Sequence, residues 1–537
     1  MGLSNLDISN NFFNGSIPIE IAMQLPSLEQ LDMSKNHFSG RIPFSFGDMS
    51  SLSSLDLSNN QLSGGIPEHL AMGCSSLTFL ALSNNKLQGK IFSVNFNLTN
   101  LSELHLDGNN FSGMIPDFLS NSSFLFTLDV SNNQLSGRIP RWMGNMSLLV
   151  KINMSNNHLE GTIPTEFCQL DLIVLDLSVN NISGSLPCFS PSQIRQVHLS
   201  KNRLQGALTD AFRNSSTLIT LDVSDNLLTG SIPSWVGGLS NLGYLLLNNN
   251  NFEGLIPTEL CNLSHLSLID LSHNNLSGRI PRCLKITTLE GVLKDYFYFL
   301  FNISGGTNQI SLSFNETIEF TTKNVSQSYK GKILPYMSGI DLSYNNLAGE
   351  IPYEIGNSCE ILVLNLAHNS LTGPIPPTFA NLMQMETLDL SYNNLSGNIP
   401  PEFARLHFLG YFNVSHNNLS GKTPERIGQL GTFDESSYLG NPFLCGTLVQ
   451  KNCSPIEPPL TPKASTGNSG NDGLIDMGVF YVSFIVSYIM VLLSIALVLY
   501  INPYWRQAWF YHVEMGVNSC YYFVVDNLPR QYRCGNM

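Results

Sequence analysis

The sequence predicts an α/β solenoid of 16 repeats with a parallel sheet on its concave face, and two observations carry this prediction. An asparagine is followed four residues later by a glycine 16 times, in the frame L-x-x-L-x-L-x-x-N-x-L-x-G-x-I-P. The usual step between these asparagines is 24 residues, with 22, 23 or 25 in a few places. A fixed period of about 20–29 residues with this leucine pattern is the signature of a leucine-rich-repeat solenoid. The asparagines are Asn11, Asn36, Asn60, Asn85, Asn109, Asn133, Asn157, Asn180, Asn202, Asn226, Asn250, Asn274, Asn345, Asn369, Asn393 and Asn417.

The repeated letters have physical reasons. In Leu55-Asp56-Leu57 the leucines enter the core and the aspartate faces solvent, because alternate residues of a strand point to opposite faces. The asparagine ends the strand, and its amide can satisfy backbone groups of adjacent turns that the bend would leave unpaired. The glycine allows a tight turn without a Cβ clash. Stacked copies therefore predict an asparagine ladder.

The repeats fall into two blocks. Repeats 1–12 occupy residues 1–282 and repeats 13–16 occupy residues 337–424, because Gly278 and Gly349 are 71 residues apart instead of 24. We assign the island insertion to residues 283–336.

Loops on a rigid scaffold often carry binding residues, so the island is a candidate ligand-binding element. Its candidate binding residues are Lys323, Tyr329 and Lys330. The alternative is that the island is only a packed unit, with a small core of its own around aromatic residues such as Phe297 and Phe299.

Composition argues against nucleic acid as a partner and indicates a secreted surface. Charged residues make up 12% of the chain, the net charge is −14, and no run of Lys and Arg is present to neutralise phosphates. The chain has 18 Asn-x-Ser/Thr triplets, which in a chain of low charge indicates a glycosylated surface. Candidate glycosylation sites are Asn14, Asn97, Asn100, Asn121, Asn145, Asn214, Asn262, Asn302, Asn315, Asn324 and Asn452.

The cysteines agree with an oxidising compartment. Cys445 and Cys453 lie in the predicted C-terminal cap, residues 425–454, and we expect them to form a disulfide. Two further pairs have the spacing of roughly one repeat and could bridge adjacent turns, which only their geometry can decide. These pairs are Cys168 with Cys188 and Cys261 with Cys283. No Cys-x-x-Cys occurs, so zinc is not indicated, and we expect no metal site and no cofactor.

The composition changes twice near the C-terminal end. Residues 455–476 are rich in Pro, Ser, Thr, Gly and Asn and predict an extracellular spacer. Residues 477–501 carry no charge and are long enough for a transmembrane helix. Arg506 follows this run, which weakly places the tail, residues 502–537, in the cytoplasm. We therefore expect a single-pass type I protein of the plasma membrane with the repeats outside the cell.

Together, these parts resemble the plant leucine-rich-repeat receptor-like proteins, which are receptors without a kinase. The motif Gly137-Arg138-Ile139-Pro140 resembles the plant-specific class of repeat. The beginning of the tail, residues 500–506, and the end of the island, residues 323–343, are similar to segments of this family. Family members also have a signal peptide and an N-terminal cysteine-bearing cap. This chain opens inside a repeat at Met1, from which we expect an N-terminally truncated sequence.

The resemblance implies a receptor that binds an extracellular peptide or protein ligand. It would signal through an adaptor receptor kinase and a co-receptor leucine-rich-repeat kinase in plant defence. Two alternatives are a developmental peptide co-receptor and a leucine-rich-repeat inhibitor of secreted hydrolases, which would lack the membrane helix. We do not expect an enzyme, because the tail has no kinase motif and the histidines are scattered over separate repeats.

We place co-receptor contact on the last four repeats, which lie nearest the predicted membrane helix. Aromatic and hydrogen-bonding side chains there suit an interface. The candidate contact residues are Asn365, His368, Asp389, Tyr392, Asn413 and His416. An aspartate also recurs between the two apolar strand residues of nine repeats. One interpretation is that Asp is simply a soluble residue that suits the turn after the strand. The other is that these aspartates form an acidic surface for a basic segment of the ligand.

Overall fold

The structure is a computed structural model that describes residues 2–92, 98–187, 193–208, 210–288, 316–358 and 360–453. These residues belong to one compact unit, Met1–Cys453. The predicted spacer, transmembrane helix and tail (455–476, 477–501 and 502–537) lie outside the described residues. No helix in the described part of the chain combines the length and the apolar character that a membrane span needs.

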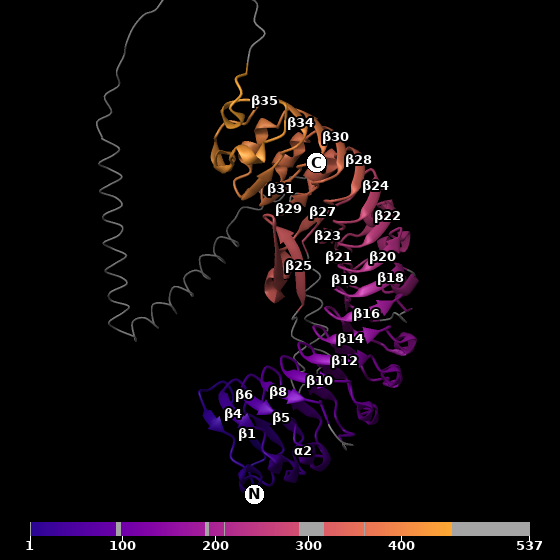
Figure 1. Cartoon of the computed structure of the whole chain (residues 1–537), viewed down its shortest axis with the longest axis vertical. Coiled ribbons are helices and arrows are strands. Elements are labelled where there is room, and N and C mark those ends of the chain that lie inside the picture. Colours follow the sequence, from indigo (N-terminus) through magenta and orange to yellow (C-terminus); the bar gives the residue numbers. More distant parts are fainter. Residues whose placement is uncertain are drawn as a thin grey trace, which may run out of the picture. The chain divides into compact units, whose positions relative to one another are not determined.

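A parallel sheet of 16 short strands lines the inner side of a curved solenoid, as the repeat pattern predicts (Figure 1). From β3 onward the middle residue of each strand is buried in the core, as strand alternation requires. β23 pairs directly with β27, so the insertion interrupts the chain but not the sheet. The strands are β1 (Asn5–Asp7), β3 (Gln30–Asp32), β5 (Ser54–Asp56), β7 (Phe79–Ala81), β9 (Glu103–His105), β11 (Thr127–Asp129), β13 (Lys151–Asn153), β15 (Val174–Asp176), β17 (Gln196–His198), β19 (Thr220–Asp222), β21 (Tyr244–Leu246), β23 (Leu268–Asp270), β27 (Gly339–Asp341), β29 (Val363–Asn365), β31 (Thr387–Asp389) and β33 (Tyr411–Asn413).

A ladder of asparagines follows the inner sheet. Asn133 Nδ2 donates to the carbonyls of Leu106, Val130 and Ser131 at 3.0, 3.2 and 2.9 Å, and its Oδ1 accepts from the Phe111 N–H at 2.9 Å. Most of the other repeats show the same contacts. These bonds satisfy the backbone groups at the bend, which confirms the role predicted for the asparagine.

Beyond the ladder, each repeat adds a second short strand and the C-terminal cap adds one more, and these strands pair in parallel with their neighbours. The repeat glycines are the last or the penultimate residues of these strands and have φ between +76° and +87°, a conformation that glycine adopts without strain. The strands are β2 (Asn14–Ser16), β4 (His37–Arg41), β6 (Gln61–Gly64), β8 (Lys86–Gly89), β10 (Asn110–Gly113), β12 (Gln134–Arg138), β14 (His158–Gly161), β16 (Asn181–Gly184), β18 (Arg203–Ala207), β20 (Leu227–Gly230), β22 (Asn251–Leu255), β24 (Asn275–Gly278), β28 (Asn346–Glu350), β30 (Ser370–Pro374), β32 (Asn394–Gly397), β34 (Asn418–Lys422) and β35 (Phe443–Cys445).

The outer side is built mostly of 3₁₀ helices, so the α part of the predicted α/β class is small. In most repeats a proline directly precedes a five-residue segment, which is too short for a stable α-helix. Among the described residues, the α-helices are α1 (Ile21–Gln24) and α2 (Glu68–Gly73). The 3₁₀ helices are η1 (Phe44–Asp48), η2 (Asp117–Asn121), η3 (Arg141–Asn145), η4 (Thr165–Gln169), η5 (Asp210–Phe212), η6 (Ser234–Gly238), η7 (Thr258–Asn262), η8 (Gly331–Tyr336), η9 (Tyr353–Asn357), η10 (Pro377–Asn381), η11 (Pro401–Arg405), η12 (Gly428–Thr432), η13 (Glu435–Ser437) and η14 (Thr447–Val449).

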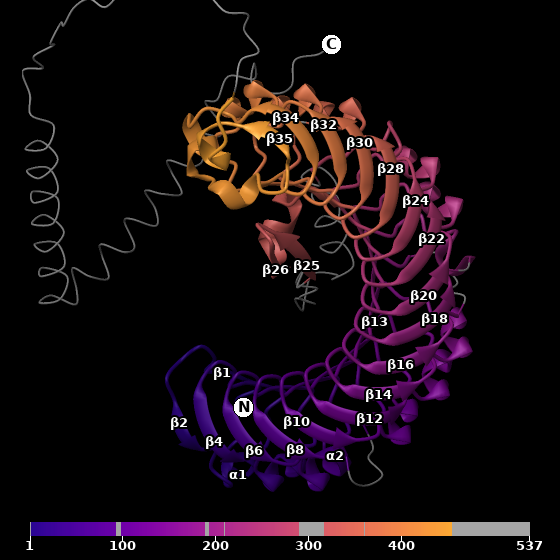
Figure 2. The same cartoon turned by 45° about the horizontal axis from the view of Figure 1, so that its top comes forward.

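From residue 316 to residue 336 the insertion forms a β-hairpin, β25 (Thr317–Thr322) and β26 (Val325–Lys330), followed by η8. Its two-residue turn, Lys323-Asn324, has φ of +51° and +60°, as the primed hairpin turns require. The hairpin lies within the arc of the solenoid, on the side of the inner sheet (Figure 2). The aromatic residues Phe297 and Phe299 lie outside the described residues.

Candidate ligand-binding site

The island hairpin is seated on the inner sheet through an apolar cluster. Ile318 and Phe320 of β25 are 0% and 1% exposed, and they pack with Tyr244, Leu246 and Leu268. These three residues occupy outward-facing strand positions that are polar in most repeats. The hairpin therefore covers the middle of the inner face, and the described part of the insertion does not pack only on itself.

Two ion pairs hold the hairpin at opposite ends. Lys201 Nζ lies 2.6 Å from Glu319 Oε2, just beyond β17. Lys323 Nζ, at the hairpin turn, lies 2.8 Å from Glu386 Oε2, just before β31. The hairpin thus reaches from the ninth to the fifteenth strand of the inner sheet.

A cluster of titratable groups lies at the base of β25. The His198 ring is 3.6 Å from Glu316 and 3.9 Å from Asp222, and Glu316 also accepts a hydrogen bond from Thr220. Burial lowers the pKa of His198, but the Asp222 and Glu316 carboxylates outweigh burial and hold this pKa well above its ordinary value. Within the described part of the chain, Glu316 Oε2 is buried without a hydrogen-bond partner.

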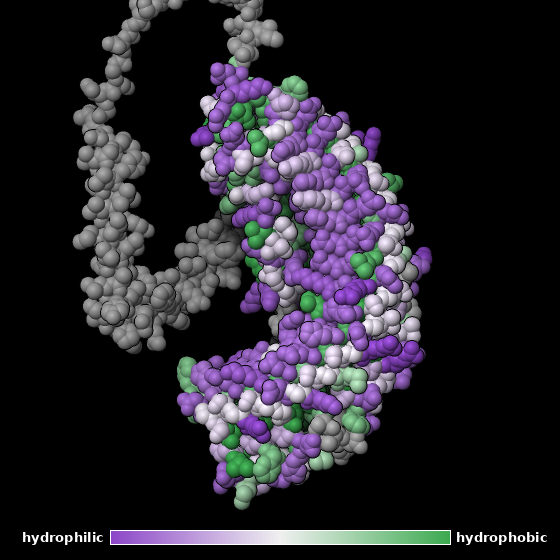
Figure 3. Space-filling view, in the orientation of Figure 1, coloured by the Kyte–Doolittle hydropathy of each residue, from purple (hydrophilic) through white to green (hydrophobic). Residues whose placement is uncertain are grey.

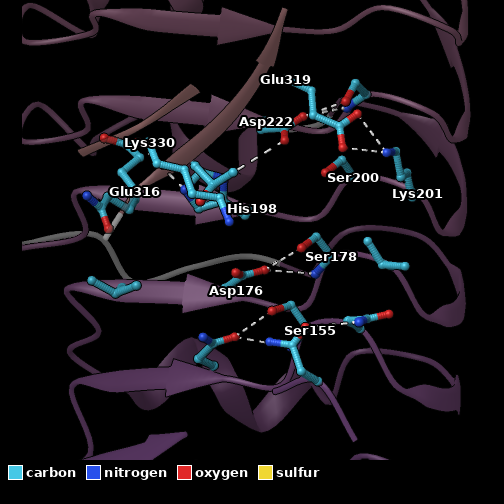
Figure 4. Close-up of a pocket in the computed structure, with 18 of the residues that line it drawn as sticks. Ser155, Asp176, Ser178, His198, Ser200, Lys201, Asp222, Glu316, Glu319 and Lys330 are labelled. Carbon is cyan, nitrogen blue, oxygen red and sulfur yellow. Dashed lines mark hydrogen bonds and ion pairs between the residues drawn. The ribbon is translucent and has the colours of Figure 1, made fainter. Parts of the chain in front are cut away.

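A hollow of about 460 Å³ opens between the hairpin and the inner sheet (Figure 4). Its wall on the repeat side carries Lys151, Asp176, Ser178 and Ser200, and the insertion contributes Lys330 together with the ion-paired Glu319. Lys151 and Lys330 make no ion pair among the described residues. The hollow is therefore polar, with two cations free to contact a ligand.

The three candidate binding residues of the island have different surroundings. Lys330 is exposed and lines the hollow. Lys323 is held by Glu386, and its N–H donates to Thr387 Oγ1 at 3.0 Å. Tyr329 packs against the apolar cluster, and its hydroxyl is hydrogen-bonded to Thr322 Oγ1 at 2.6 Å. Lys330 is thus the one of the three that the structure leaves free for a ligand.

Repeats 12–16 carry a stack of aromatic rings that includes three of the candidate co-receptor residues. His273, Tyr344, His368, Tyr392 and His416 stack in that order, with centroid distances of 4.1, 4.0, 4.2 and 4.2 Å. Each has φ between +51° and +54°, a left-handed conformation that is uncommon for residues other than Gly, Asn, Asp and His. Asn, Lys and Asp dominate this column in earlier repeats, so the aromatic residues mark a distinct surface.

The other three candidates line the adjacent strands and are less accessible. Asn365 donates to Asp341 at 2.9 Å. Asp389 is 8% exposed and accepts from the Tyr411 hydroxyl at 3.2 Å. Asn413 is half-buried and accepts from the Ser415 N–H at 3.0 Å. The exposed ring edges of Tyr344 and Tyr392, 46% and 45% exposed, are the accessible part of this surface.

The recurrent aspartates have a local role. In all nine repeats an aspartate oxygen accepts from the N–H of the serine two residues later, which closes the turn after the strand. Examples are Asp56 to Ser58 at 2.8 Å and Asp222 to Ser224 at 3.0 Å. The bonds are present for Asp7, Asp32, Asp56, Asp129, Asp176, Asp222, Asp270, Asp341 and Asp389. This favours the turn-compatible interpretation over a surface selected for basic ligands.

Two of the cysteine pairs considered above lie wholly within the described residues, and both form disulfides. Cys261–Cys283 has a Cα–Cα distance of 5.4 Å, and Cys445–Cys453 one of 5.0 Å. Cys168 is disulfide-bonded, whereas Cys188 lies outside the described residues.

The candidate glycosylation sites in the described residues are all exposed, as attachment of a sugar requires. These are Asn14, Asn100, Asn121, Asn145, Asn214, Asn262, Asn324 and Asn452. Asn97, Asn302 and Asn315 lie outside the described residues. The space-filling view shows a mainly hydrophilic surface with scattered hydrophobic side chains (Figure 3).

Some features escaped the sequence analysis. Asn441, in the cap, continues the asparagine ladder by donating to the Val414 carbonyl at 2.9 Å, although the leucine pattern is absent there.

His105, Asp107 and Asp129 lie close enough together to hold a cation. Because Ser83 and Ser131 already donate to these carboxylates, we assign no metal to them. The position of the hairpin on the inner sheet could have been inferred from the sequence. Tyr244 and Leu268 are apolar at strand positions that point away from the core, where most repeats have polar residues.

The repeats match the family described as Leucine rich repeat over residues 2–62, 43–87, 99–159, 192–252 and 360–419, and a related single-repeat pattern matches residues 265–285. Over 216 residues the chain is 61% identical to Cuscuta receptor 1 of Solanum lycopersicum. Over 211 residues it is 57% identical to Receptor-like protein 1 of Arabidopsis thaliana. The matches cover 39% and 38% of this chain but only 19% and 20% of those proteins.

Solved leucine-rich-repeat ectodomains have a similar fold. The ectodomain of the receptor kinase GASSHO1/SCHENGEN3 from Arabidopsis thaliana, in complex with CASPARIAN STRIP INTEGRITY FACTOR 2, is 28% identical with a TM-score of 0.63, over 84% of this chain and 54% of that one. The Arabidopsis receptor kinase HAESA, in complex with the peptide hormone IDA and the co-receptor SERK1, is 28% identical with a TM-score of 0.50, over 83% of each chain.

Proposed function

This chain belongs to the plant leucine-rich-repeat receptor-like proteins, and on that premise we propose that it receives an extracellular peptide or protein ligand in the hollow beside its island hairpin. The observation that carries this proposal is the hollow itself, which is bounded by consecutive repeats on one side and by the insertion on the other. A concavity on which a few polar groups converge is the usual candidate for a binding site. The complex of HAESA with the peptide hormone IDA, described above, supports the choice of ligand.

The free lysines of the hollow provide the test. Lys151→Glu and Lys330→Glu should each abolish the response of plant cells expressing the full chain to extracellular fluid that activates the wild-type protein. Lys332→Glu is the matched control, because Lys332 is exposed nearby but does not line the hollow. An unchanged response in both hollow variants would show that the ligand binds elsewhere.

We further propose that the protein acts in the plasma membrane of the plant cell, anchored by residues 477–501, and in defence. An adaptor receptor kinase and a co-receptor kinase would then supply the phosphorylation. The co-receptor would contact the aromatic stack, because an exposed surface of rings and hydrogen-bonding groups suits a protein interface.

Asp389 is unsuited to testing this contact, since it is buried and bound within the fold. Tyr392→Asn is better suited, because asparagine tolerates the left-handed backbone conformation at this position. This variant should weaken ligand-dependent co-precipitation of the co-receptor while leaving ligand binding intact. If the variant co-precipitates the co-receptor at the wild-type level, the aromatic stack is not part of the interface with the co-receptor.

A further inference from the structure

The second strand of the island hairpin is an exposed sheet edge inside the arc of the solenoid. Six consecutive residue pairs join β25 and β26, from Thr317 opposite Lys330 to Thr322 opposite Val325, without a bulge. β25 packs on the inner sheet, whereas every residue of β26 except the half-buried Tyr329 is exposed.

The register determines which backbone groups face outward. In an antiparallel pair, hydrogen-bonded and non-hydrogen-bonded residue pairs alternate. The Gly331 N–H donates to the Glu316 carbonyl at 3.2 Å, which fixes the phase of this alternation. The N–H groups of Ser326, Ser328 and Lys330 therefore point away from β25. Within the described part of the chain, none of these three N–H groups has a hydrogen-bond partner.

β26 lacks the features by which proteins protect exposed edges. Edge strands are usually blunted by prolines, bulges or several charges. β26 reads Val-Ser-Gln-Ser-Tyr-Lys, with its one charge, Lys330, at the end. The hairpin lies within the arc of the solenoid (Figure 2), and we therefore take a single extended chain, rather than a second solenoid, as the partner of this edge.

We propose that β26 receives an extended peptide segment of the ligand, which binds as a third strand of the hairpin sheet. This rests on the proposed ligand-binding function and adds the mode of recognition. Main-chain hydrogen bonds to the edge supply the affinity, and alternate side chains of the segment supply the specificity. Lys330, free of ion pairs in the described structure, favours an acidic group at one end of the segment.

Ser328→Pro tests the proposal. It removes the central outward N–H but no bond to β25, since proline is tolerated on an edge strand where the N–H faces away. Ser328→Ala is the matched control, because it removes only the side-chain hydroxyl. The probe is a fluorescent, end-capped heptapeptide, Thr-Val-Thr-Val-Thr-Glu-Thr. A twin peptide is N-methylated at alternate residues and cannot pair along its edge.

The full-length protein in detergent should bind the probe saturably and should not bind the N-methylated twin. We expect Ser328→Pro to weaken binding at least about tenfold, and Ser328→Ala to remain within about twofold of wild type. Amide exchange at Ser326, Ser328 and Lys330 should be fast without the probe and slower with it. This second readout does not depend on the proline variant.

The proposal fails if the wild-type protein does not bind the probe, or if the proline and alanine variants bind it equally. It also fails if binding leaves the three amides unprotected. A native ligand that protects the hollow around Asp176 but not β26 would support the proposed function and reject strand addition. The two claims can therefore fail separately.

Discussion

Phe320 of the insertion lies directly over Gly339 of β27. A Cβ added at Gly339 would be 2.9 Å from Cε1 of Phe320 and 3.1 Å from the Val363 Cβ, closer than such contacts normally come. Gly339 is not in the left-handed region, so the need for glycine here is one of space. The absence of a side chain at this strand position gives the ring a place on the inner sheet.

Gly339→Ala should loosen the hairpin from the sheet. Overpacking of a buried site costs roughly 1–3 kcal/mol. Here it would weaken the packing of Phe320 on the inner sheet. Amide exchange should speed up in β25 and stay unchanged in repeats far from the hairpin. Gly238→Ala is the matched control, since an added Cβ there meets nothing within 4 Å. Equal amide exchange in both variants would contradict the packing of Phe320 over Gly339.

The attachment of the hairpin base should depend on pH through His198. Its pKa is raised in the folded protein above the ordinary value of 6.5, so the charged imidazole stabilises the fold. That contribution is complete below pH 6.5 and is lost as the pH rises through the raised value. The charged groups facing His198 are Asp176, Asp222 and Glu316.

We expect amide protection around Thr317, corrected for intrinsic exchange, to fall as the pH rises from 6 to 9. His198→Gln should remove this dependence, because glutamine does not titrate. A pH dependence that survives in the glutamine variant would assign it to another group.

The ladder asparagines should contribute strongly to stability. Asn133→Ala removes four hydrogen bonds and leaves the buried Phe111 N–H without its partner, at about 1–3 kcal/mol for that unsatisfied group. The carbonyls of Leu106, Val130 and Ser131 keep hydrogen bonds from Asn109, Asn157 and the Gly108 N–H. The neighbouring Asn132 is exposed with φ +52°, so Asn132→Gly should be nearly neutral. Denaturant unfolding of the two variants compares them directly, and equal midpoints would mean that the ladder is not what holds the turns together.

The aromatic stack should stabilise the last repeats. Tyr392→Ala removes two stacked contacts, each worth about 0.5–1.5 kcal/mol beyond area burial. Tyr392→Asn should recover part of the loss, because asparagine accepts φ > 0 more readily than alanine. Amide exchange in β31 and β33 reports the change. If the amides of β31 and β33 are as protected in the alanine variant as in the wild type, the aromatic stack does not stabilise the last repeats.

Sequence reasoning was most successful where a feature repeats. The inner strands, the asparagine ladder and the repeat glycines follow from local rules about alternation, hydrogen bonding and backbone conformation, and Leu128 and Asn133 lie where these rules place them. The outer helices are mostly short 3₁₀ segments of three to six residues, so the α part of the expected α/β class is small. The seat of the hairpin depends on the path of the insertion, which has no periodicity. Only the apolar outward residues Tyr244 and Leu268 pointed to it.

The same limit applies to the binding residues. Lys323 and Lys330 look alike in sequence, but one faces Glu386 across the sheet and the other faces the hollow. The aromatic column could have been extended to His273 and Tyr344 from the sequence, because both occupy the position before the ladder asparagine. The 71-residue gap hid that His273 and Tyr344 are neighbours.

The central claim is that the island hairpin lies across the inner sheet and forms one wall of the hollow. Zero-length carbodiimide coupling of the full-length protein, read by mass spectrometry, tests it most directly, because it joins only lysines and carboxylates that are in contact. We predict two amide links, Lys201 to Glu319 and Lys323 to Glu386, whose side chains are exposed enough to react. Loss of both links, with Glu319 or Lys323 coupled instead to residues distant from the inner sheet, would contradict the account.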